Sequence, residues 1–218
     1  DEVRSALDSL SRQGEMKGLV FDIRGNGGGL LESAVGIVGN FVPKGTEVLR
    51  TRGRNKKEER IYKTTREPKY ADLPMVVLID GGSASASEIT AGSLQDLDRA
   101  VLVGSRSFGK GLVQSTRPLP YDNMLKITVS KYYIPSGRLI QAFDYSHRNP
   151  DGSVARTPDS LTNVFHTAAG REVRDGGGLK PDVEVDWGTV NRLVYNLVRD
   201  NWIFDYATKY AAEHPSIG

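Results

Sequence analysis

The sequence predicts an α/β fold built around a parallel β-sheet. Two continuous runs of aliphatic residues, 75–79 and 100–103, have the length and composition of strands in a sheet that is covered on both faces. A third strand, 18–23, turns through glycines into a helix over 30–41, and the run at 75–79 turns through small residues into a helical pattern that extends to about Asp98. Repeated strand-turn-helix units of this kind indicate neighbouring strands of one sheet.

A helix and a hairpin are predicted around this sheet in the first 70 residues. Residues 2–12 carry apolar side chains at helical spacing, with Asp1 at the N-cap position. Residues 48–69 alternate polar and apolar side chains on either side of a basic tip at 53–57, which predicts a hairpin. Acidic residues dilute the basic ones and no aromatic ladder accompanies them, so the pattern favours a solvated hairpin over a nucleic-acid site.

Two further strands, 112–119 and 124–134, are joined by a turn at 120–123. The second strand has aliphatic residues at every other position from 125 to 129, and this spacing predicts a strand with one buried face.

The last third of the chain is expected to contribute a loop and a helical tail. Residues 146–178 are polar and rich in glycine and aspartate, so they are expected to form a long excursion from the core. Residues 189–210 are expected to form one or two helices. We therefore divide the chain into a core, residues 1–186, and a C-terminal helical tail, residues 187–218.

The composition limits the classes of function. A chain of 218 residues can bury one sizeable core, or a core with a small appendage. The net charge of +2 gives no reason to expect nucleic acid or a membrane surface as the main partner. The absence of cysteine excludes disulfides and thiol chemistry, and no apolar run reaches the roughly 20 residues of a membrane span. Because the chain begins with Asp1, we expect that any signal peptide has been removed.

A serine-rich turn follows the strand at 75–79. Small residues fill 81–86, and such a turn presents a side chain at a helix N-terminus, where free N–H groups and the helix dipole favour developing negative charge. Ser83, Ser85 and Ser87 are the candidate nucleophiles. Ser83 and Ser87 are expected to point elsewhere than Ser85 in an extended turn.

A serine hydroxyl needs a positioned base to act as a nucleophile. The chain has three histidines, all in late, polar or terminal segments: His147, His166 and His214. A conventional triad of His166, Ser85 and an aspartate is one alternative. The other candidate base is Lys110, which lies between two glycines in the loop that follows 100–103, where neighbouring strand ends are expected to bring it beside the serine turn.

The lysine loop also resembles a phosphate-binding loop. Residues 104–110 satisfy the first seven positions of a P-loop and follow a strand. The eighth position is Gly111, which has no hydroxyl for a magnesium ion. A nucleotide site is therefore not expected.

These two segments resemble the C-terminal processing, or tail-specific, serine peptidases, which use a Ser/Lys dyad. The sequence Gly-Ser-Ala-Ser-Ala-Ser-Glu-Ile at 82–89 and the pattern Phe-Gly-Lys-Gly-x-x-Gln at 108–114 match the signature of the family. The resemblance implies that Ser85 is the nucleophile, Lys110 the general base and Gln114 a polar group that helps to hold the lysine. It also implies a ClpP/crotonase-like core of stacked β-β-α units, with a β-rich hairpin region and C-terminal helices.

A third segment, Asp-x-Arg-x-Asn-x-Gly-Gly at 22–29, matches the same family. In the family a glycine amide from this segment joins the amide of the residue after the nucleophile to form the oxyanion hole. The resemblance therefore implies Gly28 or Gly29, together with Ala86, as oxyanion donors. A tight turn alone would also account for the glycines. The resemblance covers residues 18–185.

The function implied by the resemblance is that of a serine endopeptidase, which cleaves protein substrates near their C-termini through an acyl-enzyme intermediate without a metal or organic cofactor. The implied substrates are polypeptides with unstructured, apolar C-terminal tails, and the implied location is the bacterial cell envelope, periplasmic or exported. No PDZ module is recognisable, so we expect this core to come from a longer protein that contains one. The alternative is a non-catalytic binding or scaffold protein, or an acyl-CoA enzyme, on the same core.

Overall fold

The computed structural model describes residues 2–55, 59–186, 188 and 191–214. Contacts divide the chain into two compact units, Asp1–Val185 and Asp186–Gly218. Three expectations fall outside the described residues: the N-cap at Asp1, positions 56–57 of the hairpin tip, and positions 189–190 of the tail helices.

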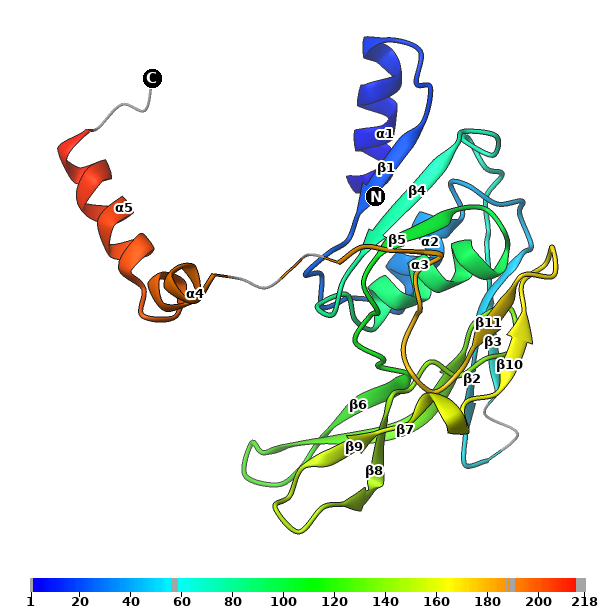
Figure 1. Cartoon of the computed structure of the whole chain (residues 1–218). Coiled ribbons are helices and arrows are strands. Elements are labelled where there is room, and N and C mark those ends of the chain that lie inside the picture. Colours follow the sequence, from blue (N-terminus) through cyan, green and yellow to red (C-terminus); the bar gives the residue numbers. More distant parts are fainter. Residues whose placement is uncertain (1, 56–58, 187, 189–190, 215–218) are drawn as a thin grey trace. The chain divides into compact units, whose positions relative to one another are not determined.

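The first unit contains a four-stranded parallel sheet, which confirms the predicted α/β class (Figure 1). The strands are β1 (Leu19–Asp22), β4 (Met75–Ile79), β5 (Val101–Gly104) and β12 (Val183–Glu184), in the spatial order β1-β4-β5-β12. Every neighbouring pair is parallel. Because the carboxyl ends of parallel strands lie at the same edge of a sheet, the loops that follow β1, β4 and β5 meet there.

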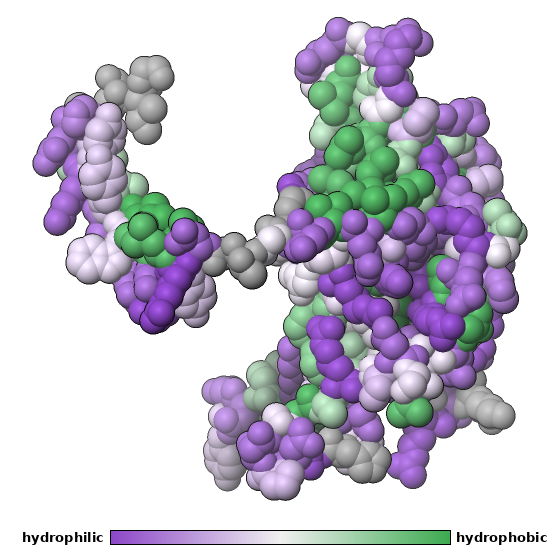
Figure 2. Space-filling view, viewed as in Figure 1, coloured by the Kyte–Doolittle hydropathy of each residue, from purple (hydrophilic) through white to green (hydrophobic). Residues whose placement is uncertain are grey.

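The second face of this sheet is only partly covered by the described residues, although the sequence predicted strands covered on both faces. Val77 of β4 and Leu102 of β5 are fully buried on the covered face. On the opposite face Val20 and Val101 are 66% and 41% exposed, and Figure 2 shows apolar side chains gathered over β1 and β4. The apolar runs therefore predicted the strands correctly but not the covering of the second face.

A second, antiparallel sheet has the strand order β3-β2-β7-β6. Two hairpins build it: β2 (Glu47–Gly53) with β3 (Arg60–Lys63), and β6 (Leu112–Pro118) with β7 (Met124–Tyr133). Both hairpins were predicted, and the pairing of β2 with β7 joins them into one sheet. The start of β6 fixes the end of the loop that contains Lys110.

The outer half of β7 is exposed, which corrects the prediction that residues 125–129 line a buried face. Leu125, Ile127 and Val129 are 43%, 37% and 36% exposed. Here β7 pairs with β6 alone, whereas β2 pairs with residues 130–133. The alternation of apolar residues predicted the strand but not its surroundings.

The predicted excursion at 146–178 contains regular structure in place of one long loop. The strand β8 (Phe143–Arg148) pairs with β9 (Val154–Arg156), and β10 (Val164–His166) pairs with β11 (Glu172–Arg174). A one-turn helix, Asp159–Leu161, lies between the two hairpins. The strands are short and mostly exposed, so they carry little of the apolar alternation that a strand prediction needs.

Two predicted helices near the N-terminus are confirmed: α1 (Glu2–Gln13) and α2 (Leu31–Val38). Leu7, one of the apolar residues at helical spacing on α1, is buried. The helix α2 follows the glycine-rich segment after β1 and packs against α3, so it holds one end of that segment.

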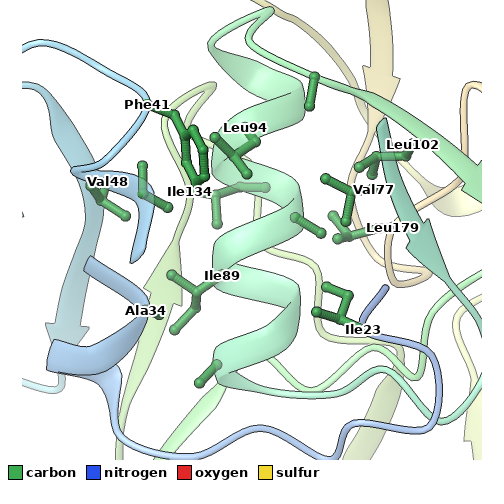
Figure 3. Packing of buried hydrophobic residues seen from close by; sticks show 14 of the residues in the cluster. Ile23, Ala34, Phe41, Val48, Val77, Ile89, Leu94, Leu102, Ile134 and Leu179 are labelled. Carbon is green, nitrogen blue, oxygen red and sulfur yellow. The ribbon is translucent and has the colours of Figure 1, made fainter. Parts of the chain in front are cut away.

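Helix α3 (Ala86–Asp96) lies at the centre of the first unit, and all of its residues are buried. Figure 3 shows apolar side chains on two sides of it, with Val77 of the parallel sheet on one side and Val48 of the antiparallel sheet on the other. A helix enclosed on all sides needs small side chains where its neighbours approach. At Gly92, for example, a Cβ would come within 2.8 Å of Ile134.

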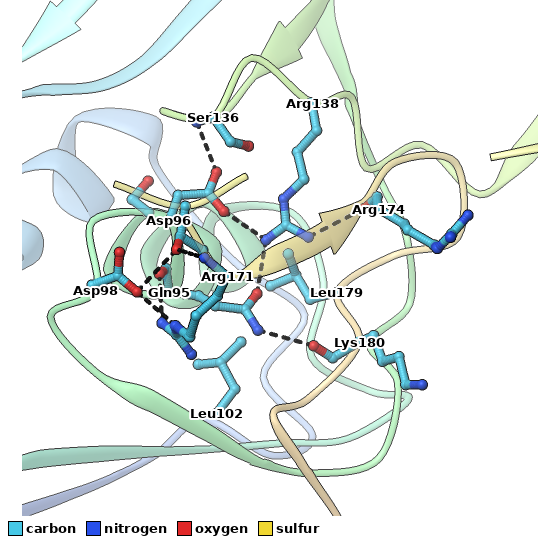
Figure 4. A network of polar contacts seen from close by, with 12 residues as sticks. Gln95, Asp96, Asp98, Leu102, Ser136, Arg138, Arg171, Arg174, Leu179 and Lys180 are labelled. Carbon is cyan, nitrogen blue, oxygen red and sulfur yellow. Dashed lines mark hydrogen bonds and ion pairs between the residues drawn. The ribbon is translucent and has the colours of Figure 1, made fainter. Parts of the chain in front are cut away.

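A buried ion pair fixes the C-terminal end of α3 (Figure 4). Arg138 donates to Oδ1 of Asp96 over 2.8 Å and to Oε1 of Gln95 over 2.7 Å, and the side chains of Arg138 and Asp96 are 1% and 0% exposed. Burial lowers the pKa of Arg138, and the charge of Asp96 opposes that shift. Because removal of one partner would leave a buried charge unpaired, this network holds the end of α3 that lies opposite the serine turn.

The second unit consists of two helices, as the sequence predicted for the tail: α4 (Arg192–Arg199) and α5 (Trp202–Glu213). The side-chain oxygen of Asn191 accepts a hydrogen bond from the Leu193 amide over 2.8 Å and so caps α4. No residue of these two helices is buried. In the part of the chain that the structure describes, no helix combines the length and the apolarity of a membrane span.

Candidate active site

Three loops meet at the carboxyl edge of the parallel sheet: the glycine loop (24–29), the serine turn (80–85) and the lysine loop (105–111). Backbone hydrogen bonds join them. The Ala84 amide donates to the Asn26 carbonyl over 3.0 Å, and the Phe108 amide donates to the Ser83 carbonyl over 3.0 Å. The serine turn lies in the middle because β4 lies between β1 and β5.

Ser85 has a backbone conformation that is rare for a residue with a side chain. Its φ is 58° and its ψ is −118°, and it is the N-cap of α3. A positive φ in a residue other than glycine is strained, and it persists only where the surrounding contacts hold it. The half-buried Ser85 is thereby placed at a helix N-terminus, which stabilises nearby negative charge.

Glu88, for which the sequence predicted no role, joins the serine turn to the lysine loop. Its side chain is fully buried on the first turn of α3. Oε2 of Glu88 accepts from the amides of Ser85 and Lys110, each over 2.9 Å. Oε1 accepts from Oγ of Ser107 over 2.5 Å and from the Gly109 amide over 2.7 Å. One carboxylate therefore holds the backbones of the predicted nucleophile and the predicted base.

The surroundings of Glu88 consist of hydrogen-bond donors. Burial raises its pKa, and the four hydrogen bonds that it accepts oppose this shift. The spacing Ser-x-x-Glu at 85–88 is that of a capping box, in which the glutamate accepts from the N-cap amide. This pattern was the signal in the sequence that could have identified Glu88.

The two glycines beside Lys110 allow the lysine loop to pack against the segment 141–142. Gly109 has a φ of 88°, and a Cβ there would overlap the side chain of Ala142. A Cβ on Gly111 would come within 2.8 Å of the Gln141 amide. Lys110 is half-buried between them, so it is flanked by two positions at which any residue larger than glycine would clash.

Tyr132 on β7 gives a second connection between the candidate nucleophile and base. Its buried hydroxyl donates to the carbonyl of Lys110 and lies 3.4 Å from the carbonyl of Ser85. Burial, together with the nearby charge of Glu88, raises the pKa of Tyr132 well above its usual value. The phenol therefore stays a neutral donor between the two loops.

Gln114 lies on β6, and it is exposed. The pairing of β6 with β7 is irregular between Val113 and Gln114, and an irregularity of this kind re-aims the side chains around it. Among the hydrogen bonds recorded for the described residues, none joins Gln114 to Lys110. The role of Gln114 in holding the lysine remains a prediction.

Gly28 of the glycine loop packs directly on the serine turn. Its φ is 96°, and a Cβ there would lie 2.6 Å from the Ala84 carbonyl oxygen, 2.8 Å from the Ala86 amide nitrogen and 2.9 Å from Cβ of Ser85. Only glycine permits both the conformation and the approach. The predicted oxyanion donors on the two loops are thus neighbours in space.

The amides of the glycine loop differ in whether they are free to bind a ligand. The Gly28 amide donates to Oδ1 of Asn26 over 2.9 Å. Within the described structure no acceptor is recorded for the amides of Gly29 and Ala86. Of the two glycines that the sequence left open, the geometry therefore favours Gly29 as the donor to an oxyanion.

Asp80 ties the glycine loop to the serine turn. Its Oδ1 accepts from the amides of Gly25, Gly82 and Ser83 over 2.8, 2.9 and 3.1 Å. Burial acts to raise the pKa of Asp80, but the hydrogen bonds outweigh burial, and the pKa is lowered. A charged Asp80 thus holds both sides of the candidate oxyanion hole.

The serines on either side of Ser85 make hydrogen bonds within the protein. Oγ of Ser83 donates to the Ile23 carbonyl over 2.8 Å and accepts from the Asp80 amide over 3.0 Å. Oγ of Ser87 donates to Oδ1 of Asn26 over 2.9 Å. Both hydroxyls hold loops together, which agrees with the expectation that they point elsewhere than Ser85.

His166 lies far from Ser85. Its neighbour Thr167 donates to Asp98 over 3.0 Å, beyond the C-terminal end of α3. Ser85 is at the opposite end of this helix, and the 11 residues of α3 span roughly 16 Å. The geometry gives no support to a triad through His166.

The lysine loop does not present free amides to a phosphate. A P-loop binds phosphate through its backbone N–H groups, but the amides of Gly109 and Lys110 donate to Glu88. Among the described residues no group of three His, Cys, Asp or Glu side chains is placed to hold a metal ion. The arrangement suits acyl transfer by a serine at a helix N-terminus.

Comparisons with known proteins give matches to one family of peptidases. The profile of Peptidase family S41 matches residues 1–154. The chain is 41% identical to the carboxy-terminal-processing protease of Bartonella bacilliformis over 180 residues, which are 80% of this chain and 39% of that protein. It is 37% identical to the carboxy-terminal processing protease CtpA of Bacillus subtilis over 139 residues, which are 64% of this chain and 29% of that protein. The chain therefore spans less than half the length of these relatives.

Solved structures show the same relationship. The photosystem II D1 C-terminal processing protease has a TM-score of 0.61 and 31% identity, over 84% of this chain and 38% of that chain. Mature CPAF has a TM-score of 0.53 at 13% identity, over 84% of this chain and 41% of that chain, which is a likeness of fold alone.

Proposed function

The chain belongs to peptidase family S41, and we propose that it acts as a serine endopeptidase through a dyad of Ser85 and Lys110. One observation carries this proposal. The amides of Ser85 and Lys110 donate to the same oxygen of Glu88, so a nucleophile and a base that come from different loops are held at one point.

Lys110 is the base in this proposal. Its neutral amine takes the proton from Oγ of Ser85, and Oγ attacks the carbonyl carbon of the scissile peptide bond. An ammonium group cannot accept a proton, so only the fraction of the protein with a neutral Lys110 reacts. The rate is therefore expected to rise with pH.

The amides of Gly29 and Ala86 are the proposed oxyanion donors. They stabilise the negative charge that develops on the carbonyl oxygen, and each donor of this kind contributes about 3–4 kcal/mol in comparable sites. The N-terminus of α3 adds to the same field. In this proposal the strained backbone of Ser85 lets both its Oγ and the amide of Ala86 face the same substrate carbonyl.

Collapse of the tetrahedral intermediate breaks the C–N bond. The ammonium of Lys110 protonates the leaving amine, which departs and leaves the acyl group on Ser85. Lys110 then takes a proton from a water molecule that attacks the ester. The bond between the carbonyl carbon and Oγ of Ser85 breaks, Lys110 returns the proton to Oγ, and the acid product is released. No step of this scheme requires a metal ion or an organic cofactor.

The proposed substrates are polypeptides with unstructured, apolar C-terminal tails, cleaved near the C-terminus. The support is the 37–41% identity to proteins that are named carboxy-terminal processing proteases. Because this chain spans less than half of those proteins, we propose that a PDZ module elsewhere in a longer protein recruits the tail. By the same resemblance, we propose that it acts in the bacterial cell envelope, in the periplasm or exported.

The test is cleavage of a disordered polypeptide with an apolar C-terminus by the wild-type chain, Ser85→Ala and Lys110→Ala. Lys126→Ala is the matched control, because Lys126 is an exposed lysine on β7. Wild type and Lys126→Ala are expected to cleave with a rate that rises from pH 6 to about 9, and the two dyad variants are expected to be inactive. Full activity of Lys110→Ala would reject the dyad. Turnover that depends on an acyl-CoA, or a wild type that binds the polypeptide without cleaving it, would favour the alternative functions.

A further inference from the structure

Arg156 lies beside the lysine loop, at the end of β9. It is paired with Phe143 of β8. Its Nη2 donates to the carbonyl of Phe108 over 3.2 Å, and its guanidinium carbon lies 5.0 Å from the centre of the Phe143 ring. The guanidinium of Arg156 is therefore held by two contacts, one with β8 and one with Phe108, which is two positions from Lys110 in the lysine loop.

No carboxylate partner of Arg156 is recorded among the described residues. Other arginines of the first unit do have one: Arg106 pairs with Asp159 over 3.1 Å, and Arg171 pairs with Asp98 over 2.6 Å. A guanidinium has five N–H donors, and stacking on a ring leaves the donors at its edge free. Arg156 is exposed, so those donors are open to a ligand.

An aromatic surface continues from the lysine loop past Arg156. The Phe108 and Phe143 ring centres are 5.4 Å apart, and those of Phe143 and Tyr145 are 6.2 Å apart. Phe108 is 37% exposed and Tyr145 is 51% exposed. We call these three rings, Phe108, Phe143 and Tyr145, the aromatic wall. It offers apolar surface next to the free edge of the guanidinium.

We propose that Arg156 and the aromatic wall form a substrate subsite, in which Arg156 binds a carboxylate of the polypeptide and the wall binds an apolar side chain next to it. The inference rests on the proposed peptidase function. Phe108 is only two positions from Lys110 in the lysine loop, so a polypeptide substrate that reaches Lys110 comes close to the aromatic wall. A carboxylate matches the geometry and charge of a guanidinium edge. The carboxylate is either the C-terminus of the substrate or an acidic side chain.

Binding to Ser85→Ala tests the subsite independently of cleavage. The probes are fluorescein-labelled peptides with an apolar C-terminal segment in three forms: the free acid, the C-terminal amide, and the amide with one internal glutamate. Fluorescence anisotropy gives the Kd of each. The variants, made in the Ser85→Ala background, are Arg156→Gln, Arg156→Lys and Arg148→Gln. Arg148 is the matched control, because it is an exposed arginine on the same hairpin whose recorded bond is to the Gly152 carbonyl.

We expect a carboxylate to tighten binding about tenfold in Ser85→Ala and in the Arg148→Gln variant. Arg156→Gln should abolish this difference, and Arg156→Lys should retain part of it, because lysine keeps the charge but not the flat, stacked group. Preference for the free acid identifies the C-terminus as the source, and preference for the internal glutamate identifies a side chain. A difference that persists in Arg156→Gln, or no binding of any probe, would overturn the subsite. Loss of cleavage with intact Arg156-dependent binding would count against the peptidase function alone.

Discussion

The amide nitrogens of Ser85 and Lys110 lie at the same distance, 2.9 Å, from one carboxylate oxygen of Glu88. The carboxylate is buried on the first turn of α3, a helix that is enclosed on all sides. The position of the candidate nucleophile relative to the candidate base therefore depends on a side chain that lies beneath both loops.

Replacement of Glu88 by glutamine is expected to disturb both loops. The glutamine NH₂ group would face two donors from which the carboxylate oxygen now accepts hydrogen bonds, and both bonds would be lost. The free energy of unfolding should fall by about 2–4 kcal/mol, since hydrogen bonds to a charged group contribute about 1.5–3 kcal/mol each, and kcat should fall as well. Urea denaturation and cleavage kinetics measure the two effects. Glu184→Gln, on an exposed residue of β12, is the control, and a Glu88→Gln protein that matches it in both assays would contradict the role of Glu88.

The sign of the Glu88 pKa shift adds a pH dependence. Burial raises this pKa in the folded protein, so the folded state binds the proton more readily than the unfolded chain. The pH-dependent stabilisation that is linked to this shift is therefore fully present below the ordinary pKa and is lost as the pH rises through the folded value. Wild type should lose more stability than Glu88→Gln over this interval, from about pH 4 upward. Unfolding free energies measured across it check the sign.

Gly28→Ala is expected to damage the oxyanion hole. The new Cβ would lie within 3 Å of three atoms of the serine turn, and the φ of 96° is unfavourable for alanine. Because this Cβ would displace the Ala86 amide, a proposed oxyanion donor, we expect kcat to fall about 10²- to 10³-fold, with a smaller change in KM. Gly27→Ala is the control on the same loop, because a Cβ there meets nothing within 4 Å. Equal activity of the two variants would show that the loop is not part of the site.

The sequence predicted the parts of this site that depend on small residues, because glycine and other small residues are needed where two backbone segments pack closely or turn tightly. Glycines at 28, 109 and 111 mark places where a Cβ would clash, and small residues before α3 mark a turn that a helix must follow. The capping-box spacing could have identified Glu88 as a partner of the Ser85 amide, but its other three donors come from a loop about twenty residues further on, and the sequence does not show that this loop meets α3. The oxyanion donor was left open between Gly28 and Gly29 because the sequence does not show that the amide of Gly28 donates to the side chain of Asn26.

The burial of the strands was predicted less well than their positions. Val20, Val101 and the outer half of β7 have the apolar patterns of covered strands, but the described residues leave them exposed. A pattern of apolar residues reports that a surface is suited to being covered, and it cannot identify what covers it. The short strands β8 to β11 were not predicted at all, because polar residues dominate them and hide the apolar alternation of a strand.

Ser83→Ala is expected to lower stability without removing the chemistry. Its buried hydroxyl donates to the Ile23 carbonyl and accepts from the Asp80 amide, so its loss leaves both groups without this partner at a cost of about 1–3 kcal/mol. Labelling by a serine-reactive probe should persist in Ser83→Ala and in Ser87→Ala, and it should disappear in Ser85→Ala. Probe labelling that survives in Ser85→Ala but not in Ser83→Ala would reassign the nucleophile.

Asp80→Asn is expected to destabilise the chain at neutral pH and to do so less in acid. The pKa of Asp80 is lowered in the folded protein, so its contribution is present above the ordinary pKa and is lost as the pH falls through the folded value. At pH 7 the variant should lose about 1–2 kcal/mol, because Asp80 is partly exposed. This deficit should shrink below about pH 4. Urea denaturation at several pH values measures it, with Asp72→Asn, an exposed aspartate, as the control; a deficit that is constant with pH would contradict the assignment.

Tyr132→Phe tests whether the phenol couples the two loops. The hydroxyl donates to the Lys110 carbonyl and approaches the Ser85 carbonyl, so the variant leaves two partly buried acceptors without this donor and should lose about 1–3 kcal/mol of stability. Because the donor lies between nucleophile and base, kcat should fall while KM changes little. Tyr133→Phe is the matched control, since Tyr133 is the next residue on β7 and lies on the opposite face of the strand. Normal kcat in Tyr132→Phe, with reduced stability, would mean that Tyr132 supports the fold and that Glu88 alone sets the relation of Ser85 to Lys110.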